Sequence, residues 1–188
     1  MKKNISKSLI MTPMPVLIIA TYDENGVPNA MNAAWGMQCD TDAIMISLGK
    51  HKTTENLKIK KAFTVSFATK ETLIESDYFG IESGVNLNKI ERAGFHTHPS
   101  SFVDAPVIEE YPVTLECEVL DLADDEGDYR LTGKVINVLA DESVLNEQGK
   151  VDLSKLNLIA YDSGAHVYRE IGAVVGKAFS AGLAIKNK

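Results

Sequence analysis

Cysteine is scarce in this chain of 188 residues, which contains only two copies. Cys39 and Cys117 lie far apart in the sequence, so they form neither a CxxC redox pair nor the framework of a structural zinc site. A chain of this length can build a sizeable core without disulfides. We therefore expect a reducing, cytoplasmic location.

Positive charge and long apolar runs are also lacking. Nineteen Lys and Arg stand against 26 Asp and Glu, which gives a net charge of −7. This balance argues against a nucleic-acid partner. No apolar run approaches the ~20 residues of a membrane-spanning helix. Pro13 and Pro15 interrupt the first apolar stretch, which is expected to enter a strand and not to form a signal peptide. We expect neither a nucleic acid nor a membrane as partner.

The sequence is rich in patterns typical of β-strands joined by hairpins. A near-continuous apolar run at 16–22 ends at the turn signal Asp23–Gly26. Apolar and polar residues alternate over 113–119, and 129–139 is expected to pair back as the second strand of a long hairpin. Further strands are predicted at 27–35, 43–48, 63–68 and 156–161.

Helical patterns are short and lie between the strands. One helix is predicted to begin at Thr53 or Thr54, either of which can cap its first turn. Two short helices around Gly80 and Gly84, a loop with His96 and His98, and a docked helix in the tail 168–183 are also expected. The regular strand–helix alternation of a doubly wound fold is missing. The sequence predicts a mainly β fold, an antiparallel β-barrel with a few helices, in a single domain spanning 1–188.

Three local motifs do not support the sites that they suggest. Gly49-Lys50 lacks the upstream glycine and the following Ser or Thr of a P-loop. Gly80–Gly84 lacks a serine at the third position of a nucleophile elbow. His96 and His98 could both face a metal, but no acidic or cysteine ligand is near in sequence, so we expect a surface loop and no metal.

A local positive field stands out in this acidic chain. Residues 50–61 hold five Lys and one His against a single Glu. Thr53 and Thr54, at the start of the predicted helix, could receive a phosphate there. The alternative is a solvated helix face with an ordinary threonine cap. Lys89 and Arg92 could add cations from another part of the fold.

The strand at 29–35 has small residues in its middle and ends at Trp35, the only Trp in the chain. Small side chains allow a flat ligand to approach the backbone, and an indole supplies a rigid apolar wall. A buried structural Trp is the alternative interpretation.

Together, these segments resemble the flavoredoxin-like branch of the flavin reductase family, from about residue 14 to 182. The resemblance rests on the order and spacing of Pro15-Val16, 26–29, 32–35, Ser47-Leu48, Lys52-Thr53, 83–89 and 172–179. It implies a six-stranded antiparallel FMN-binding split barrel that forms a homodimer with two FMN sites near the interface. The FMN-binding residues that it implies are Asn29, Met31, Asn32, Ala33, Ala34, Trp35, Ser47, Leu48, Thr53, Thr54, Ser83, Gly84, Lys89 and Tyr161.

One segment departs from the family pattern. Related sequences tend to carry a His in the strand after the long hairpin turn, where this chain has Asp128-Tyr129-Arg130. Either Arg130 replaces that His as a donor or the contact is lost.

The resemblance implies that FMN carries the redox chemistry, so no catalytic side chain is expected. The leading prediction is an FMN-dependent oxidoreductase that takes electrons from a reduced nicotinamide or from another redox protein. Two alternatives are open: a flavoredoxin-type electron carrier without nicotinamide activity, and a split-barrel binding module without redox turnover.

Overall fold

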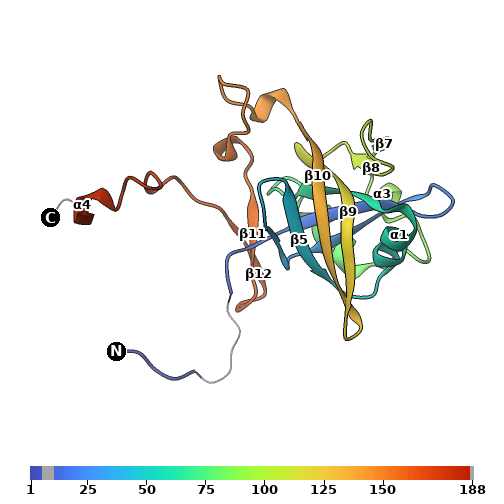
Figure 1. Cartoon of the computed structure of the whole chain (residues 1–188), viewed down its shortest axis with the longest axis horizontal. Coiled ribbons are helices and arrows are strands. Elements are labelled where there is room, and N and C mark those ends of the chain that lie inside the picture. Colours follow the sequence, from blue (N-terminus) through green and yellow to red (C-terminus); the bar gives the residue numbers. More distant parts are fainter. Residues whose placement is uncertain (6–10, 187–188) are drawn as a thin grey trace.

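The computed structural model describes residues 1–5 and 11–186, and its centre is a curled antiparallel sheet (Figure 1). Seven strands follow one another in the order β3-β2-β6-β9-β10-β5-β4. Their bounds are β2 Leu17–Tyr22, β3 Pro28–Ala33, β4 Gly36–Gln38, β5 Ala43–Leu48, β6 Ala62–Phe67, β9 Val113–Asp125 and β10 Asp128–Ala140. The predicted antiparallel split barrel is confirmed, with the short β4 as an additional strand of its sheet.

The chain crosses from one edge of this sheet to the other at Ala34 and Trp35. β3 forms one edge, whereas β4 pairs with β5 at the opposite edge. The backbone N–H of Ser47 donates to the carbonyl of Trp35 at 2.8 Å, so Trp35 is already held by the second edge. The predicted strand 27–35 therefore ends at Ala33, and Trp35 lies in the split between the two edges.

The main core fills the inside of the barrel. Gly133 permits close packing there, because a Cβ at this position would lie 2.3 Å from Cζ of Phe63. Each large apolar side chain that is removed from water contributes roughly 1.5–3 kcal/mol. The core side chains include Leu17, Ile19, Ile46, Leu48, Leu57, Phe63, Val65, Cys117 and Leu131.

The outer face of the sheet is covered by α2 (Leu73–Ile81), α3 (Lys89–Arg92), β7 (Thr97–Pro99) and β8 (Pro106–Ile108). These elements enclose a second apolar cluster that includes Ile18, Phe79 and Ile108. The segment predicted as a loop around His96 and His98 is in part a strand, since Thr97 pairs with Ile108.

Helix α1 (Lys52–Lys60) follows β5 and lies against β2 and β3. His51 is its N-cap residue. The Oγ1 of Thr54 accepts from the His51 N–H at 2.9 Å and donates to the His51 carbonyl at 2.7 Å. The helix ends at Lys61, which has a left-handed φ of 55°.

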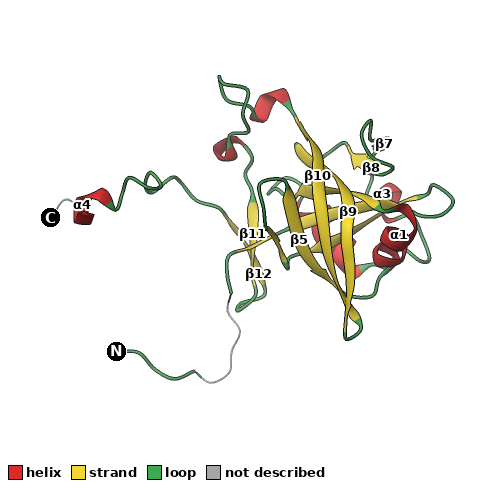
Figure 2. Ribbon diagram, viewed as in Figure 1, coloured by secondary structure: helices red, strands yellow, loops and turns green. Residues whose placement is uncertain are grey.

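A smaller sheet flanks the barrel and joins β1 (Met14–Pro15), β11 (Ile159–Asp162) and β12 (Val167–Glu170) (Figure 2). Two 3₁₀ turns, Glu142–Val144 and Leu153–Lys155, lead into it. The predicted helix docked within 168–183 is wrong. Residues 167–170 form β12, and the exposed helix α4 (Leu183–Lys186) buries none of its residues. No helix among residues 1–5 and 11–186 is long and apolar enough to span a membrane.

Candidate functional site

A buried polar contact joins the edge strand β3 to the first turn of α1. The Asn29 amide donates from Nδ2 to Oγ1 of Thr53 at 2.8 Å, and both side chains are buried. Thr53 is the second residue of the helix, where backbone N–H groups lack intrahelical acceptors. The N-terminus of α1 therefore provides hydrogen-bond donors and a positive dipole end beside Asn29.

Lys89 brings a buried cation to the same place. Its Nζ donates to the carbonyls of Phe79 at 2.8 Å and Glu82 at 3.0 Å, at the C-terminal end of α2. Burial lowers the pKa of Lys89 to about 8. A lysine with this pKa gains strongly from an anion, which would offset the cost of burying its charge.

The loop after α2 approaches Asn29 closely, and only glycine fits at position 84. A Cβ on Gly84 would lie 1.9 Å from Oδ1 of Asn29 and 3.5 Å from Cε of Lys89. This contact fixes the position of the loop relative to β3. Asn29, Thr53, Gly84 and Lys89 all line one cavity of about 480 Å³.

A second cavity, of about 320 Å³, has an aromatic wall. The ring of Trp35 lies 6.4 Å from that of Tyr161, and Tyr161 lies 6.0 Å from Tyr168. The Tyr161 hydroxyl is 2.9 Å from Nδ1 of His166, and the Tyr168 hydroxyl donates to Asp77 at 2.6 Å. Burial, followed by the contact with Asp77, raises the pKa of Tyr168 to about 12, so its hydroxyl stays protonated at neutral pH.

The two cavities form one trough along β3, because Asn32, Gly80 and Ile81 line both of them. β3 is an edge strand, so alternate residues direct their backbone N–H and C=O groups away from β2. α2 closes the other side, where a Cβ on Gly80 would lie 3.3 Å from the Asn32 side chain. The trough thus has a cationic end, a hydrogen-bonding middle and an aromatic end.

Most of the predicted site residues lie in this trough. The cationic cavity is lined by Asn29, Met31, Asn32, Thr53, Ser83, Gly84 and Lys89. The aromatic cavity is lined by Asn32, Ala33, Ala34, Trp35 and Tyr161. Trp35 is 60% exposed, so it is not the buried structural residue that the alternative interpretation required.

Three predicted residues lie outside the lining of both cavities. Thr54 is buried and its hydroxyl bonds to the backbone of His51, so it caps the helix. Leu48 belongs to the barrel core. The exposed Ser47 contributes its backbone N–H to Trp35, next to the aromatic cavity.

Sequence reasoning missed the face of α2 and the hairpin between β11 and β12. Asp77, Gly80 and Ile81 line the trough from α2, and His166 and Tyr168 line it from the hairpin. The residues of α2 mix apolar, acidic and small side chains, and this composition carries no ligand signal. The cationic cavity is also lined by Lys50, His51 and Lys52, which belong to the Lys-rich segment 50–61 singled out in the sequence.

Other candidate groups lie away from the trough. His96 pairs with Glu110 at 2.8 Å, and the ring of His98 contacts the carbonyl of Pro99. The part of the chain that the structure describes contains no group of three or more His, Cys, Asp or Glu placed to hold a metal. Arg130 bonds to Asp125 at 2.7 Å and lines neither cavity.

Comparison with known proteins identifies the family of the chain and several solved structures that resemble it. The family model for the flavin reductase like domain matches residues 10–166. The flavoredoxin of Desulfovibrio vulgaris (Miyazaki F) is 31% identical, with a TM-score of 0.92 over 97% of this chain and 100% of that chain. A flavoredoxin from Methanosarcina acetivorans is 24% identical, with a TM-score of 0.90 over 98% and 99% of the two chains. An FMN-binding protein from Thermus thermophilus, with bound 1-cyclohex-2-enone, is 18% identical, with a TM-score of 0.77 over 94% and 99%.

Proposed function

The chain belongs to the flavin reductase like domain family, and from this premise we propose that it binds FMN in the trough and acts as an NAD(P)H-linked flavin oxidoreductase. The single observation that carries the proposal is the pairing, in one continuous trough, of a buried cation at a helix N-terminus with an aromatic wall.

The cationic end suits the FMN phosphate. A phosphate dianion that leaves water needs both hydrogen bonds and compensating charge. Thr53 and the N-terminal N–H groups of α1 would supply the hydrogen bonds. Lys89 would supply the charge from a buried position, and Lys50 and Lys52 line the same cavity. Lys52 is already paired with Asp23 at 3.2 Å, so Lys89 is the stronger candidate.

The aromatic end suits the flavin ring. The small residues Ala33 and Ala34 allow a flat ring to approach the backbone, and Trp35 and Tyr161 bound it. The free edge of β3 can hydrogen-bond the heteroatoms of the ring. The donor set and the shape of the trough therefore fit FMN.

Bound flavin would supply the electron-accepting and hydride-transferring chemistry. The protein's own contribution is to orient the ring and to direct N–H donors at the edge where negative charge collects on reduction. Tyr161 and Tyr168, both hydrogen-bonded in the aromatic cavity, hold the wall in place. We assign no catalytic acid or base.

A flavoredoxin-type electron carrier is the second candidate, favoured by the 31% identity with the Desulfovibrio vulgaris flavoredoxin. In that case another redox protein would be the electron donor, and nicotinamide turnover would be absent. In either case we propose a homodimer. We also propose a cytoplasmic location, since Cys39 and Cys117 are both free thiols.

An absorbance titration tests FMN binding. The purified chain should show flavin bands, or gain perturbed flavin bands on addition of FMN, with one FMN per chain. An unperturbed flavin spectrum at saturating FMN would contradict the FMN proposal. The remaining alternative would then be a split-barrel binding module without flavin chemistry.

Steady-state turnover separates the oxidoreductase from the carrier. Consumption of NADH or NADPH with FMN present supports the oxidoreductase. A flavin-loaded chain that turns over neither nucleotide, yet exchanges electrons with a reduced redox protein, supports the carrier.

A further inference from the structure

Asp77 is the acidic side chain of the aromatic cavity. It belongs to α2, which closes the trough opposite β3. Among the described residues that line this cavity, Asp77 is the only Asp or Glu, and none is Lys or Arg. The cationic cavity at the other end is lined by three lysines, Lys50, Lys52 and Lys89, against two glutamates. The trough is therefore polarised along its length, with excess positive charge at the proposed phosphate end and a negative charge beside the proposed ring.

The hydrogen-bond partner of Asp77 is a neutral hydroxyl and not a cation. Tyr168 in β12 donates to Oδ1 of Asp77 at 2.6 Å. Burial, followed by this contact, raises the pKa of Tyr168, so the proton stays on the tyrosine and the negative charge on Asp77. The neighbouring Arg169 is paired with Asp162 at 2.7 Å. His166, which also lines the cavity, is exposed, so water and salt screen any charge on it.

We propose that Asp77 lowers the reduction potential of FMN bound in the trough, and that Tyr168 moderates this effect through its hydrogen bond to Asp77. This role rests on the proposed FMN function, in which a reduced nicotinamide or a redox protein supplies the electrons. Reduction of the ring by two electrons and one proton adds one negative charge, whereas uptake of a second proton removes it. A carboxylate beside the ring disfavours the added charge by Coulomb repulsion and has little effect on the uncharged oxidised ring. Asp77 therefore makes the bound flavin a stronger electron donor.

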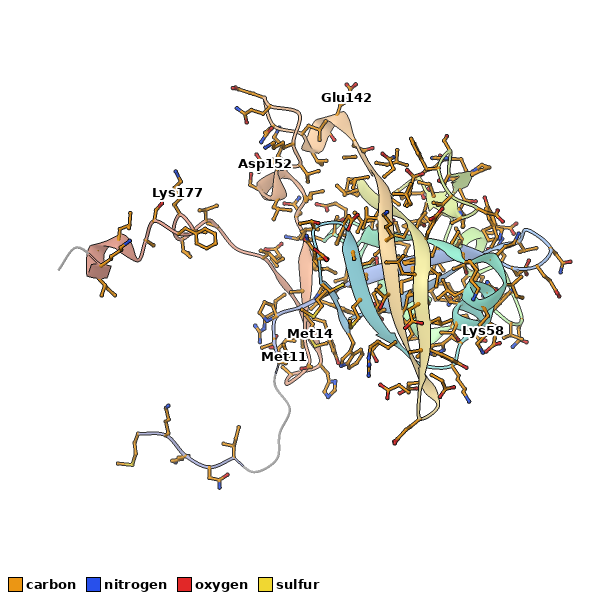
Figure 3. The ribbon with its side chains drawn as sticks, viewed as in Figure 1. Met11, Met14, Lys58, Glu142, Asp152 and Lys177 are labelled. Carbon is orange, nitrogen blue, oxygen red and sulfur yellow. The ribbon has the colours of Figure 1, made fainter. Side chains whose placement is uncertain are left out.

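Tyr168 belongs to a hairpin that is held in place independently of its hydroxyl. β1 pairs with β11, where Met14 is opposite Tyr161, and Met14 lies beside this hairpin in Figure 3. Ile159 and Ala160 in β11 are buried. The ring of Tyr168 packs against the apolar cluster that includes Ile159. Removal of the hydroxyl alone therefore changes the surroundings of the carboxylate and keeps the hairpin where it is.

Reductive titration of the FMN-loaded chain, with dithionite and a reference dye of known potential, measures the proposed effect. A unit charge about 10 Å from the ring, at an effective dielectric constant of about 20, changes an equilibrium constant by roughly tenfold. Asp77→Asn keeps the shape of the side chain and can still accept the Tyr168 hydroxyl. It should strengthen the binding of reduced FMN relative to oxidised FMN by about tenfold, which is a rise of about 30 mV for a two-electron couple.

Glu75→Gln is the matched control for this variant. Glu75 lies two residues before Asp77 on α2 but lines neither cavity. The two changes remove the same charge from the same helix, so a general effect of net charge would appear in both. The control should change the ratio of the two affinities by less than about twofold. Equal changes in the two variants would overturn the role of Asp77.

Tyr168→Phe is the second test, because it should shift the potential in the opposite direction. The variant keeps the Asp77 carboxylate but removes the donor that stabilises its charge. Reduced FMN should therefore bind more weakly relative to oxidised FMN than it does in the wild type. A merely structural role would change both affinities in parallel and leave their ratio as it was. An unchanged ratio in either variant, or shifts of the same sign in both, would overturn the proposal.

Titration of the oxidised chain with FMN separates this inference from the proposed function. If the wild type and the variants bind FMN and have equal potentials, the role of Asp77 falls and the flavin proposal stands. If the wild type binds no FMN, the flavin proposal falls and the role of Asp77 falls with it. Should Asp77→Asn lower the melting temperature of the FMN-free chain, Tyr168→Phe decides the matter, because the sign of its expected shift is specific to the carboxylate.

Discussion

Asn29 on the edge strand β3 donates a 2.8 Å hydrogen bond from its amide to the hydroxyl of Thr53 in the first turn of α1. This contact joins a sheet edge to a helix N-terminus, and Lys89 and Gly84 surround it. It leaves the Thr53 hydroxyl proton free to donate to an anion. The contact is therefore the structural basis of the proposed phosphate site.

Replacing Thr53 with Val should weaken FMN binding by about tenfold to a hundredfold. The change removes one hydrogen bond to a charged group, which is worth about 1.5–3 kcal/mol. Isothermal titration of the folded variant with FMN would measure this loss of affinity. Thr53→Ser keeps the hydroxyl and should bind FMN nearly as well as the wild type. Equal losses of FMN affinity in both variants would show that the Thr53 hydroxyl does not bind the phosphate.

Gly84→Ala should disrupt the polar end of the trough. Its Cβ would lie 1.9 Å from Oδ1 of Asn29, so Asn29 must move away from Thr53. We expect a loss of about 1–3 kcal/mol in the free energy of unfolding, measured by urea denaturation, together with weaker FMN binding. Gly172→Ala is the matched control, because a Cβ there meets nothing within 4 Å. If both variants unfold at the same urea concentration, the close approach of Gly84 is not maintained in solution.

FMN affinity should fall as the pH rises above about 8. Burial holds the pKa of Lys89 at about 8, so its ammonium is charged below that pH and neutral above it. The FMN phosphate is a dianion over this range. Binding above pH 8 must include reprotonation of Lys89, which weakens affinity by up to about tenfold per pH unit. Riboflavin, which has no phosphate, should show much less dependence on pH.

Lys89→Met provides the control for this titration. The variant should lose far more affinity for FMN than for riboflavin, and its FMN affinity should no longer fall above pH 8. Equal loss of affinity for the two ligands would place Lys89 away from the phosphate.

Trp35→Leu should weaken FMN binding and leave the stability of the FMN-free chain within about 0.5 kcal/mol, because Trp35 is 60% exposed. The variant keeps an apolar side chain but removes the flat wall and its N–H donor. Urea denaturation and FMN titration on one preparation would measure both quantities. A large loss of stability with unchanged affinity would make Trp35 a structural residue.

The sequence predicts the β-rich fold because the relevant signals are local: alternation of apolar and polar residues identifies the long hairpin of β9 and β10. Most residues of the trough are implied only by the family resemblance, since the small residues before Trp35 also fit a buried structural Trp. The crossing at Ala34 and Trp35 has no such signal. It depends on pairing between β4 and β5, which only the folded barrel determines.

The roles of the adjacent Thr53 and Thr54 could not be predicted from local sequence alone. Both Thr53 and Thr54 are suited to a helix start, but α1 begins at Lys52, with His51 as its N-cap. Thr54 is then three residues after the cap and bonds back to His51, while Thr53 lines the cavity. A shift of one residue in the helix start decides which threonine is available to a ligand.

The fluorescence of Trp35 during titration with FMN tests the central claim most directly. The chain has no other Trp, so its emission reports on the aromatic end of the trough alone. We predict strong quenching that saturates at one FMN per chain, because an oxidised flavin beside the indole accepts its excitation. Emission that stays unchanged while FMN binds would place the flavin elsewhere and contradict the assignment of this trough.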